Sequence, residues 1–140
     1  MPTPKRIEWT PQFSVNVRAL DEQHKRIFMM LDAINQIVRR EKKGHDLIDV
    51  LDAMVLYVQE HFRDEEGLLK QYDYPEFDEH KQGHKEFLRQ TGGFRVRYFE
   101  GEEDQELGVE LMRYLLRWVK NHIMVQDRAY SAYLNDLGVT

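Results

Sequence analysis

Side chains of the kind that bind metal ions occur in pairs in the middle of the sequence. His61 and Glu65 are four residues apart, and so are His80 and His84. On an α-helix, residues four apart share one face about one turn apart, so each pair can reach a single point. A turn around Pro75 separates the two pairs. If both flanking segments are helices, this turn folds them antiparallel and brings the four side chains together.

The hydrophobic periodicity predicts four amphipathic helices, each with ligand-type residues on its apolar stripe. The stripe positions alternate in steps of three and four, which is typical of a helix that faces a core. The stripes are Leu20, His24, Ile27, Leu31, Ile34 and Val38; Leu47, Leu51, Met54, Val58, His61, Glu65, Leu68 and Tyr72; Phe77, His80, His84, Phe87, Thr91, Phe94 and Tyr98; and Gly108, Leu111, Leu115, Trp118 and His122, continued by Asp127, Tyr130, Leu134 and Leu137.

Four such helices joined by short turns, without strand-like alternation, predict an all-α fold, an antiparallel up-down-up-down four-helix bundle. We expect the bundle to span residues 19–140. Residues 1–18 contain three prolines and lack periodicity, so we interpret them as an N-terminal arm that packs on the bundle through Trp9 and Phe13. Gly92 and Gly93 predict a bend or fraying inside the third helix.

One irregularity interrupts the fourth stripe. The step from His122 to Asp127 is five residues rather than four. An undistorted helix would place these two side chains about 140° apart around its axis, too far to serve one site. The spacing therefore predicts a π-bulge, or another local unwinding, between them.

Composition limits the partners that this chain can have. At 140 residues it fits one domain, and a net charge of −5 argues against a broad surface for nucleic acid. The absence of cysteine restricts any metal site to nitrogen and oxygen donors. No apolar run has membrane length, and the first residues lack the apolar core of a signal peptide. We expect a soluble cytoplasmic protein without membrane insertion.

The convergence of ligands on one level of the bundle indicates a metal centre. Five of the six histidines lie on predicted stripes, whereas His45 lies in a predicted turn. With Glu65 and Asp127 they make seven donors, and without a metal several would be buried and unpaired at about 1–3 kcal/mol each. Seven donors are too many for one structural zinc, and calcium and magnesium prefer oxygen. The set suits two first-row transition ions bridged by Glu65 and Asp127, among which spacing does not separate iron, cobalt and manganese.

The order of these donors resembles the ligand signature of the hemerythrin family, specifically its single-domain bacteriohemerythrins. The matching positions are His24, His61-x-x-x-Glu65, His80-x-x-x-His84 and His122-x-x-x-x-Asp127, with the Tyr74-Pro75 turn ahead of the third helix. The resemblance implies a non-haem centre of two iron ions. His80, His84 and His122 would bind one iron, and His24 and His61 the other. Glu65, Asp127 and an oxo or hydroxo group would bridge them.

The same resemblance implies reversible binding of dioxygen, for carriage, storage or local supply. The iron held by two histidines has one ligand fewer, so it keeps an open position for dioxygen. The family places an apolar oxygen pocket around that position, at Ile27, Phe62, Trp118, Val119 and Ile123. Two other classes stay open, namely a di-iron enzyme that reduces peroxide or nitric oxide or acts as an oxidase, and an oxygen or iron sensor acting through a partner. The expected partners are dioxygen and a protein that consumes it, and the expected oligomeric state is a monomer.

Overall fold

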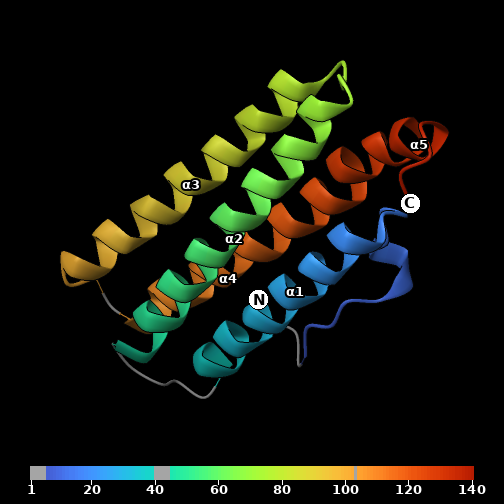
Figure 1. The fold of residues 1–140 in the computed structure, drawn as a ribbon. Helices are drawn as coiled ribbons and strands as arrows, with labels where there is room; N and C mark the ends of the chain where they lie inside the picture. Colours follow the sequence, from blue (N-terminus) through green and yellow to red (C-terminus); the bar gives the residue numbers. More distant parts are fainter. Residues whose placement is uncertain (1–5, 40–44, 103) are drawn as a thin grey trace.

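Four helical rods run antiparallel around a shared core in the computed structural model, which describes residues 6–39, 45–102 and 104–140 (Figure 1). The rods are α1 (Arg18–Arg39), α2 (His45–Gln71), α3 (Phe77–Phe99) and a composite fourth rod. That fourth rod consists of α4 (Asp104–Asn121), the π-helix η2 (His122–Asp127) and α5 (Arg128–Asp136). No strand occurs among the described residues. The predicted all-α four-helix bundle is confirmed.

The predicted stripes form the core of this bundle. Every member of the first stripe, from Leu20 to Val38, is buried. The second stripe is buried from Leu47 to Glu65, after which Leu69 takes the core position and Leu68 is only partly buried. Within the described residues, no helix is both long and apolar enough to cross a membrane.

The turn between α2 and α3 sets the two histidine-bearing helices side by side. Asp73 adopts the left-handed conformation at φ 51°, which aspartate tolerates better than most residues, and this reverses the chain. The amide of Tyr74 donates to the carbonyl of Leu69 at 2.9 Å, and the hydroxyl of Tyr133 on α5 donates to the carbonyl of Tyr72 at 2.6 Å. The turn is thereby anchored to the composite fourth rod.

The segment that precedes α1 lies alongside that helix in the opposite direction (Figure 1). The amide of Ile7 donates to Asp32 at 2.9 Å, and the amide of Val15 donates to Asp21 at 2.8 Å. The short 3-10 helix η1 (Pro11–Phe13) buries Phe13, whereas Trp9 is partly buried. This segment covers the outer side of α1.

Three expectations about local structure were wrong. Leu137 is 51% exposed because α5 ends one residue before it. The helix α3 continues unbroken through Gly92 and Gly93, so the predicted fraying does not occur. His45 is the first residue of α2 rather than part of a turn. The structure describes its backbone but not its side chain.

Candidate metal centre

The predicted irregularity in the fourth rod is a six-residue π-helix, η2 (His122–Asp127). A π-helix has more residues per turn than an α-helix, so a step of five returns to the same face. Both His122 and Asp127 are buried, and His122 Nε2 lies 2.9 Å from Asp127 Oδ1. The π-helix therefore makes two ligand-type residues converge where a regular α-helix would separate them.

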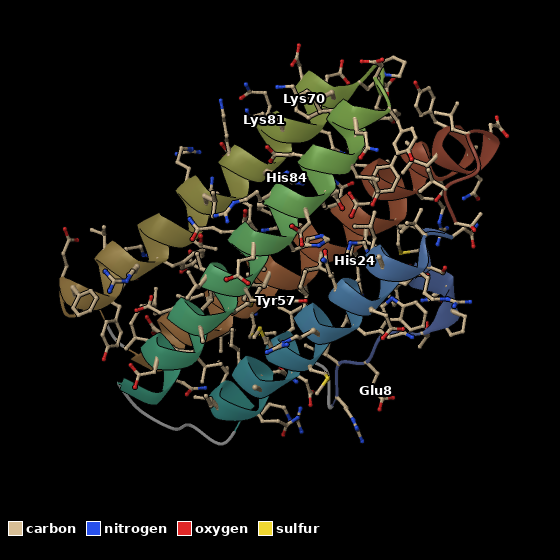
Figure 2. All side chains as sticks on the ribbon, viewed as in Figure 1. Glu8, His24, Tyr57, Lys70, Lys81 and His84 are labelled. Carbon is tan, nitrogen blue, oxygen red and sulfur yellow. The ribbon has the colours of Figure 1, made fainter. Side chains whose placement is uncertain are left out.

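The seven predicted donors are all buried and form two adjacent groups. In the first group, His84 Nε2 lies 3.0 Å from Glu65 Oε1 and 3.2 Å from His122 Nε2, and His80 Nε2 contacts the same oxygen of Glu65. In the second group, His24 Nε2 lies 3.1 Å from His61 Nε2. Figure 2 labels one histidine of each group, His84 on α3 and His24 on α1. Each group contains a set of four ligand atoms within 4.8 Å of one another.

The two carboxylates each present one oxygen to each group. Glu65 gives Oε1 to the three-histidine group and Oε2 to the two-histidine group, where it lies 3.3 Å from His61 Nε2. Asp127 Oδ1 lies 3.2 Å from His80 Nε2, and its Oδ2 lies 3.3 Å from His24 Nε2. This is the arrangement that two bridging carboxylates require.

Outer hydrogen bonds fix which nitrogen of three histidines faces the centre. The Nδ1–H groups of His61, His84 and His122 donate outward, with acceptor distances of 2.6, 2.7 and 2.9 Å. The acceptors are side-chain oxygens of Gln23, Glu66 and Gln126, respectively. With the proton on Nδ1, the lone pair of a neutral imidazole lies on Nε2. The three Nε2 atoms are therefore oriented as metal ligands.

The orientation of the Gln23 amide is itself determined by a neighbour. Its NH₂ group donates to Asp64 Oδ2 at 2.9 Å, so its carbonyl oxygen faces His61 and can only accept. Glu66 accepts for the simpler reason that an ionised carboxylate has no proton to donate. Both contacts exclude the tautomer that would point an N–H into the centre.

Charge and hydrogen bonding in the centre favour a bound cation. Asp127 is fully buried, and neither of its carboxylate oxygens accepts a hydrogen bond of acceptable geometry, although histidine nitrogens lie close. A buried carboxylate in that condition carries a desolvation penalty of at least about 1–3 kcal/mol. Where the converging Nε2 atoms are unprotonated, their lone pairs also repel one another. Metal ions placed between the donors relieve both problems, and five imidazoles with two carboxylates are donors that first-row transition ions accept.

Comparison with known proteins gives the same assignment. Residues 15–134 match the family profile described as the hemerythrin HHE cation binding domain. The chain belongs to the hemerythrin family. It is 31% identical to a bacteriohemerythrin of Stenotrophomonas maltophilia over 133 residues, covering 92% of this chain and 84% of that protein. It is 27% identical to hemerythrin subunit alpha of Lingula anatina, covering 94% and 97% of the two chains.

The fold also matches hemerythrins of known structure. A crystal structure of wild-type hemerythrin superimposes with a TM-score of 0.75 at 29% identity, over 90% of this chain and 95% of that one. The chain is also 29% identical to a bacteriohemerythrin of Methylococcus capsulatus, covering 92% of this chain and 97% of that protein. The sequence resemblance to the hemerythrin family is thus confirmed.

The residues expected to line an oxygen pocket are buried around the hemerythrin centre, with one exception. Ile27, Phe62, Val119 and Ile123 are each at most 3% exposed, whereas Trp118 is partly buried. The Phe62 ring stacks on His84 with centroids 3.7 Å apart, and Trp118 stacks on His122 at 4.4 Å. These two aromatic rings therefore pack against the three-histidine group.

Four residues that contact the ligands were not identified from the sequence. Gln23, Glu66 and Gln126 accept hydrogen bonds from ligand histidines, and each is the immediate sequence neighbour of a predicted donor. The fourth, Tyr130, donates to Glu65 Oε2 at 3.0 Å. Burial raises its pKa well above the usual value, so the hydroxyl keeps its proton and remains a donor. For the first three, a polar residue beside a donor was the only sequence signal, and it is a weak one, whereas Tyr130 lies on the predicted stripe three residues after Asp127.

Protons are expected to compete with metal for this centre. Burial would lower the pKa of His24 and His80, but the facing carboxylates of Asp127 and Glu65 raise both to about 9. For His122, the charge of Asp127 outweighs burial and raises the pKa to about 10. A metal-free protein should hold these protons at pH 7, and because the metal needs unprotonated Nε2 atoms, affinity should fall as pH falls.

Loading metal-free protein at pH 7 should therefore release about three protons per chain. Calorimetric titration of Zn²⁺ in two buffers with different ionisation enthalpies measures this number. Equal heats in both buffers would contradict the protonation assigned to the three histidines.

The close approach of α3 to η2 predicts that G83A weakens metal binding. A Cβ at Gly83 would lie 2.9 Å from Gln126 Oε1, the oxygen that accepts the proton of His122 Nδ1. The amide of this flexible side chain must shift, which weakens its hydrogen bond to His122. Complete loss of such an outer contact lowers metal affinity by about 10–100-fold, so we expect a loss of about tenfold or less. The matched control is G93A in the same helix, where a Cβ meets nothing within 4 Å. It should keep full affinity and gain up to about 1 kcal/mol of stability. Competition with a chromophoric chelator measures both affinities, and equal values would contradict the role of this contact.

Proposed function

We propose that this chain holds two iron ions and binds dioxygen reversibly, for carriage, storage or local supply. The observation that carries the proposal is the shared pair of carboxylates. Glu65 and Asp127 each turn one oxygen toward three histidines and the other toward two. His80, His84 and His122 would hold one iron, His24 and His61 the other, with Glu65, Asp127 and an oxo or hydroxo group as bridges. Bound iron of this kind supplies reversible exchange of electrons with dioxygen.

The unequal number of histidines supports a division of labour between the two groups. The three-histidine group has five protein donors when the two carboxylate oxygens are included, whereas the two-histidine group has four. The chain therefore leaves more coordination space beside His24 and His61. We assign the binding of dioxygen to that side.

The chain's own side chains keep that space dry. Ile27 follows His24 by three residues on α1, and Val119 and Ile123 flank His122 on the fourth rod, all at most 2% exposed. We propose that they form the wall of the oxygen pocket, with Phe62 and Trp118 closing it beyond the three-histidine group. A wall without polar groups excludes water and protons, and this slows irreversible oxidation of the metal.

The donor set favours binding over oxidation of a substrate. Carboxylate-bridged di-iron proteins of the ferritin-like type take Glu-x-x-His motifs from their helices and are rich in glutamate. Here five of seven donors are imidazoles. Neutral ligands add less negative charge than carboxylates and therefore stabilise oxidised iron less. A centre with this donor set is therefore suited to a protein that returns its oxygen unchanged.

An anaerobic titration tests the proposal. Protein loaded with ferrous iron is exposed to dioxygen, and its visible spectrum is followed while the gas is cycled. We expect an absorption band that appears at about two irons per chain and disappears when oxygen is removed. Zinc-loaded protein is the matched control, because zinc has no redox chemistry, and it should show no band.

Three outcomes would contradict the proposal in different ways. Conversion to a stable ferric form that releases no oxygen would favour a sensor or an enzyme. Steady consumption of peroxide, nitric oxide or dioxygen with an electron donor would show an enzyme. Failure to retain iron would remove the metal centre itself.

A further inference from the structure

A cavity of about 180 Å³ lies next to the three-histidine group. It is bounded by the α2–α3 turn, the first turn of α3, the π-helix and the start of α5. Its lining residues are Tyr74, Glu76, Glu79, His80, Val125, Gln126 and Ala129. Two of these belong to the metal centre, since His80 is a proposed ligand and Gln126 orients His122. The cavity therefore lies against the three-histidine group, and several of its other lining residues are exposed at the surface.

His80 differs from the other proposed ligands in the surroundings of its Nδ1 atom. Gln23, Glu66 and Gln126 take the Nδ1 protons of three histidines, and His24 is fully buried. The Nδ1 atom of His80 makes no hydrogen bond to any described residue, although the side chain is only 3% exposed. Unlike His24 Nδ1, which is buried without a hydrogen-bond partner, His80 Nδ1 is not fully shielded from solvent. His80 is also the one proposed ligand that lines the cavity, so it is the residue of the centre that an incoming ion meets first.

The charge around the cavity selects for cations. Glu76 and Glu79 line it with exposed carboxylates, and no lysine or arginine is among its lining residues. Lys81, labelled at this end of the bundle in Figure 2, holds its ammonium 5.9 Å from the ring centre of Phe77. A mouth lined by one sign of charge concentrates counter-ions and speeds their capture. Anions are repelled there, and neutral dioxygen gains nothing from the carboxylates.

The cavity also has room for an ion with bound water. Its volume of about 180 Å³ is several times the roughly 30 Å³ that one water molecule occupies in the liquid. Val125 of the π-helix and Ala129 of α5 also line the cavity, and neither side chain can bind a metal ion.

We infer that this cavity is the port through which divalent iron reaches the centre, with Glu76 and Glu79 attracting the ion toward His80. The inference rests on the proposed metal centre but concerns the route of loading rather than the chemistry of the loaded site. It predicts that the port governs the rate of metal uptake and leaves the final stoichiometry unchanged.

Stopped-flow mixing of Co²⁺ with metal-free protein tests the port, because bound cobalt absorbs visible light. The double variant E76Q/E79Q should take up Co²⁺ about three- to tenfold more slowly at low salt. The difference should disappear in about 1 M salt, where charges are screened within about 3 Å. The control D49N/E100Q makes the same charge change at exposed positions toward the other end of α2 and α3. It should match the unmodified protein.

A second variant tests the route without changing charge. Ala129 is exposed and lines the cavity, and A129L fills its mouth with a residue that suits a helix. Uptake should then be slower at both salt concentrations, with two ions still bound at the end. If both variants take up Co²⁺ at the rate of the unmodified protein, the proposed port is wrong, but the proposed metal centre is not affected. If the unmodified protein binds no Co²⁺, the metal centre fails and the port fails with it.

Discussion

The variant E65Q is expected to bind one metal ion or none, where the unmodified protein binds two. Glu65 is the residue that both groups of ligand atoms share. Glutamine keeps its shape but replaces one oxygen by an NH₂ group, which cannot act as a ligand and would turn its protons toward the Nε2 atoms. It also removes one of the two buried negative charges that balance the bound cations. Both effects act on the bridge itself, so the loss should exceed that of any single outer contact.

The matched control for this variant is E60Q, which makes the same change at an exposed position of the same helix. Each protein is saturated with ferrous iron without oxygen, passed over a desalting column and analysed for iron per chain. We expect two ions for E60Q and at most one for E65Q, with unchanged helical circular dichroism in E60Q. Retention of two ions by E65Q would show that Glu65 is not a bridge.

The helical periodicity predicted most of the residues that reach the core. A step of three or four places each successive side chain on the same face, so His24, His61 and Glu65 could be assigned to the interior along with their apolar neighbours. The five-residue step from His122 to Asp127 predicted the π-helix for the same reason, because only a wider turn keeps both residues inside. Burial of a donor is therefore readable from one sequence.

Contacts between helices were not readable in this way. Gln23 on α1 accepts from His61 on α2, and Glu66 on α2 accepts from His84 on α3. Both acceptors lie beside the core stripe, and which neighbour they meet depends on how the helices are rotated and spaced. The periodicity of one helix carries no information on that rotation. The stacking of Phe62 on His84 was inaccessible for the same reason.

Helix ends were the least predictable feature. Leu137 continues the apolar stripe in phase, yet the chain leaves the helix after Asp136 and turns at Gly138, where φ is +86°. The amides of Gly138 and Val139 then donate to Asn135 and Leu134, as in a helix that closes with a left-handed residue. Gly138 could have been recognised in the sequence as the residue that closes the helix, but the predicted stripe ran on to Leu137, beyond the end of α5.

Removing the metal is expected to lower the midpoint of thermal unfolding by about 20 °C. An ion that binds only the folded chain stabilises it by about 4 kcal/mol at a thousandfold excess over its dissociation constant, so two ions contribute about 8 kcal/mol. Without them, the buried charge of Asp127 is balanced only by protons on the facing histidines, at the contact that joins α1 to the fourth rod.

Scanning calorimetry of iron-loaded and chelator-treated protein measures this difference, and reloading should restore the higher midpoint. The variant E65Q supplies the decisive control, since a protein that cannot hold the second ion should lose much less stability when treated with chelator. An equal loss in E65Q would mean that the chelator acts on the fold by some route other than this centre. Equal midpoints for the loaded and treated unmodified protein would mean that the seven buried donors are stable by themselves, and the electrostatic argument for a bound cation would fail.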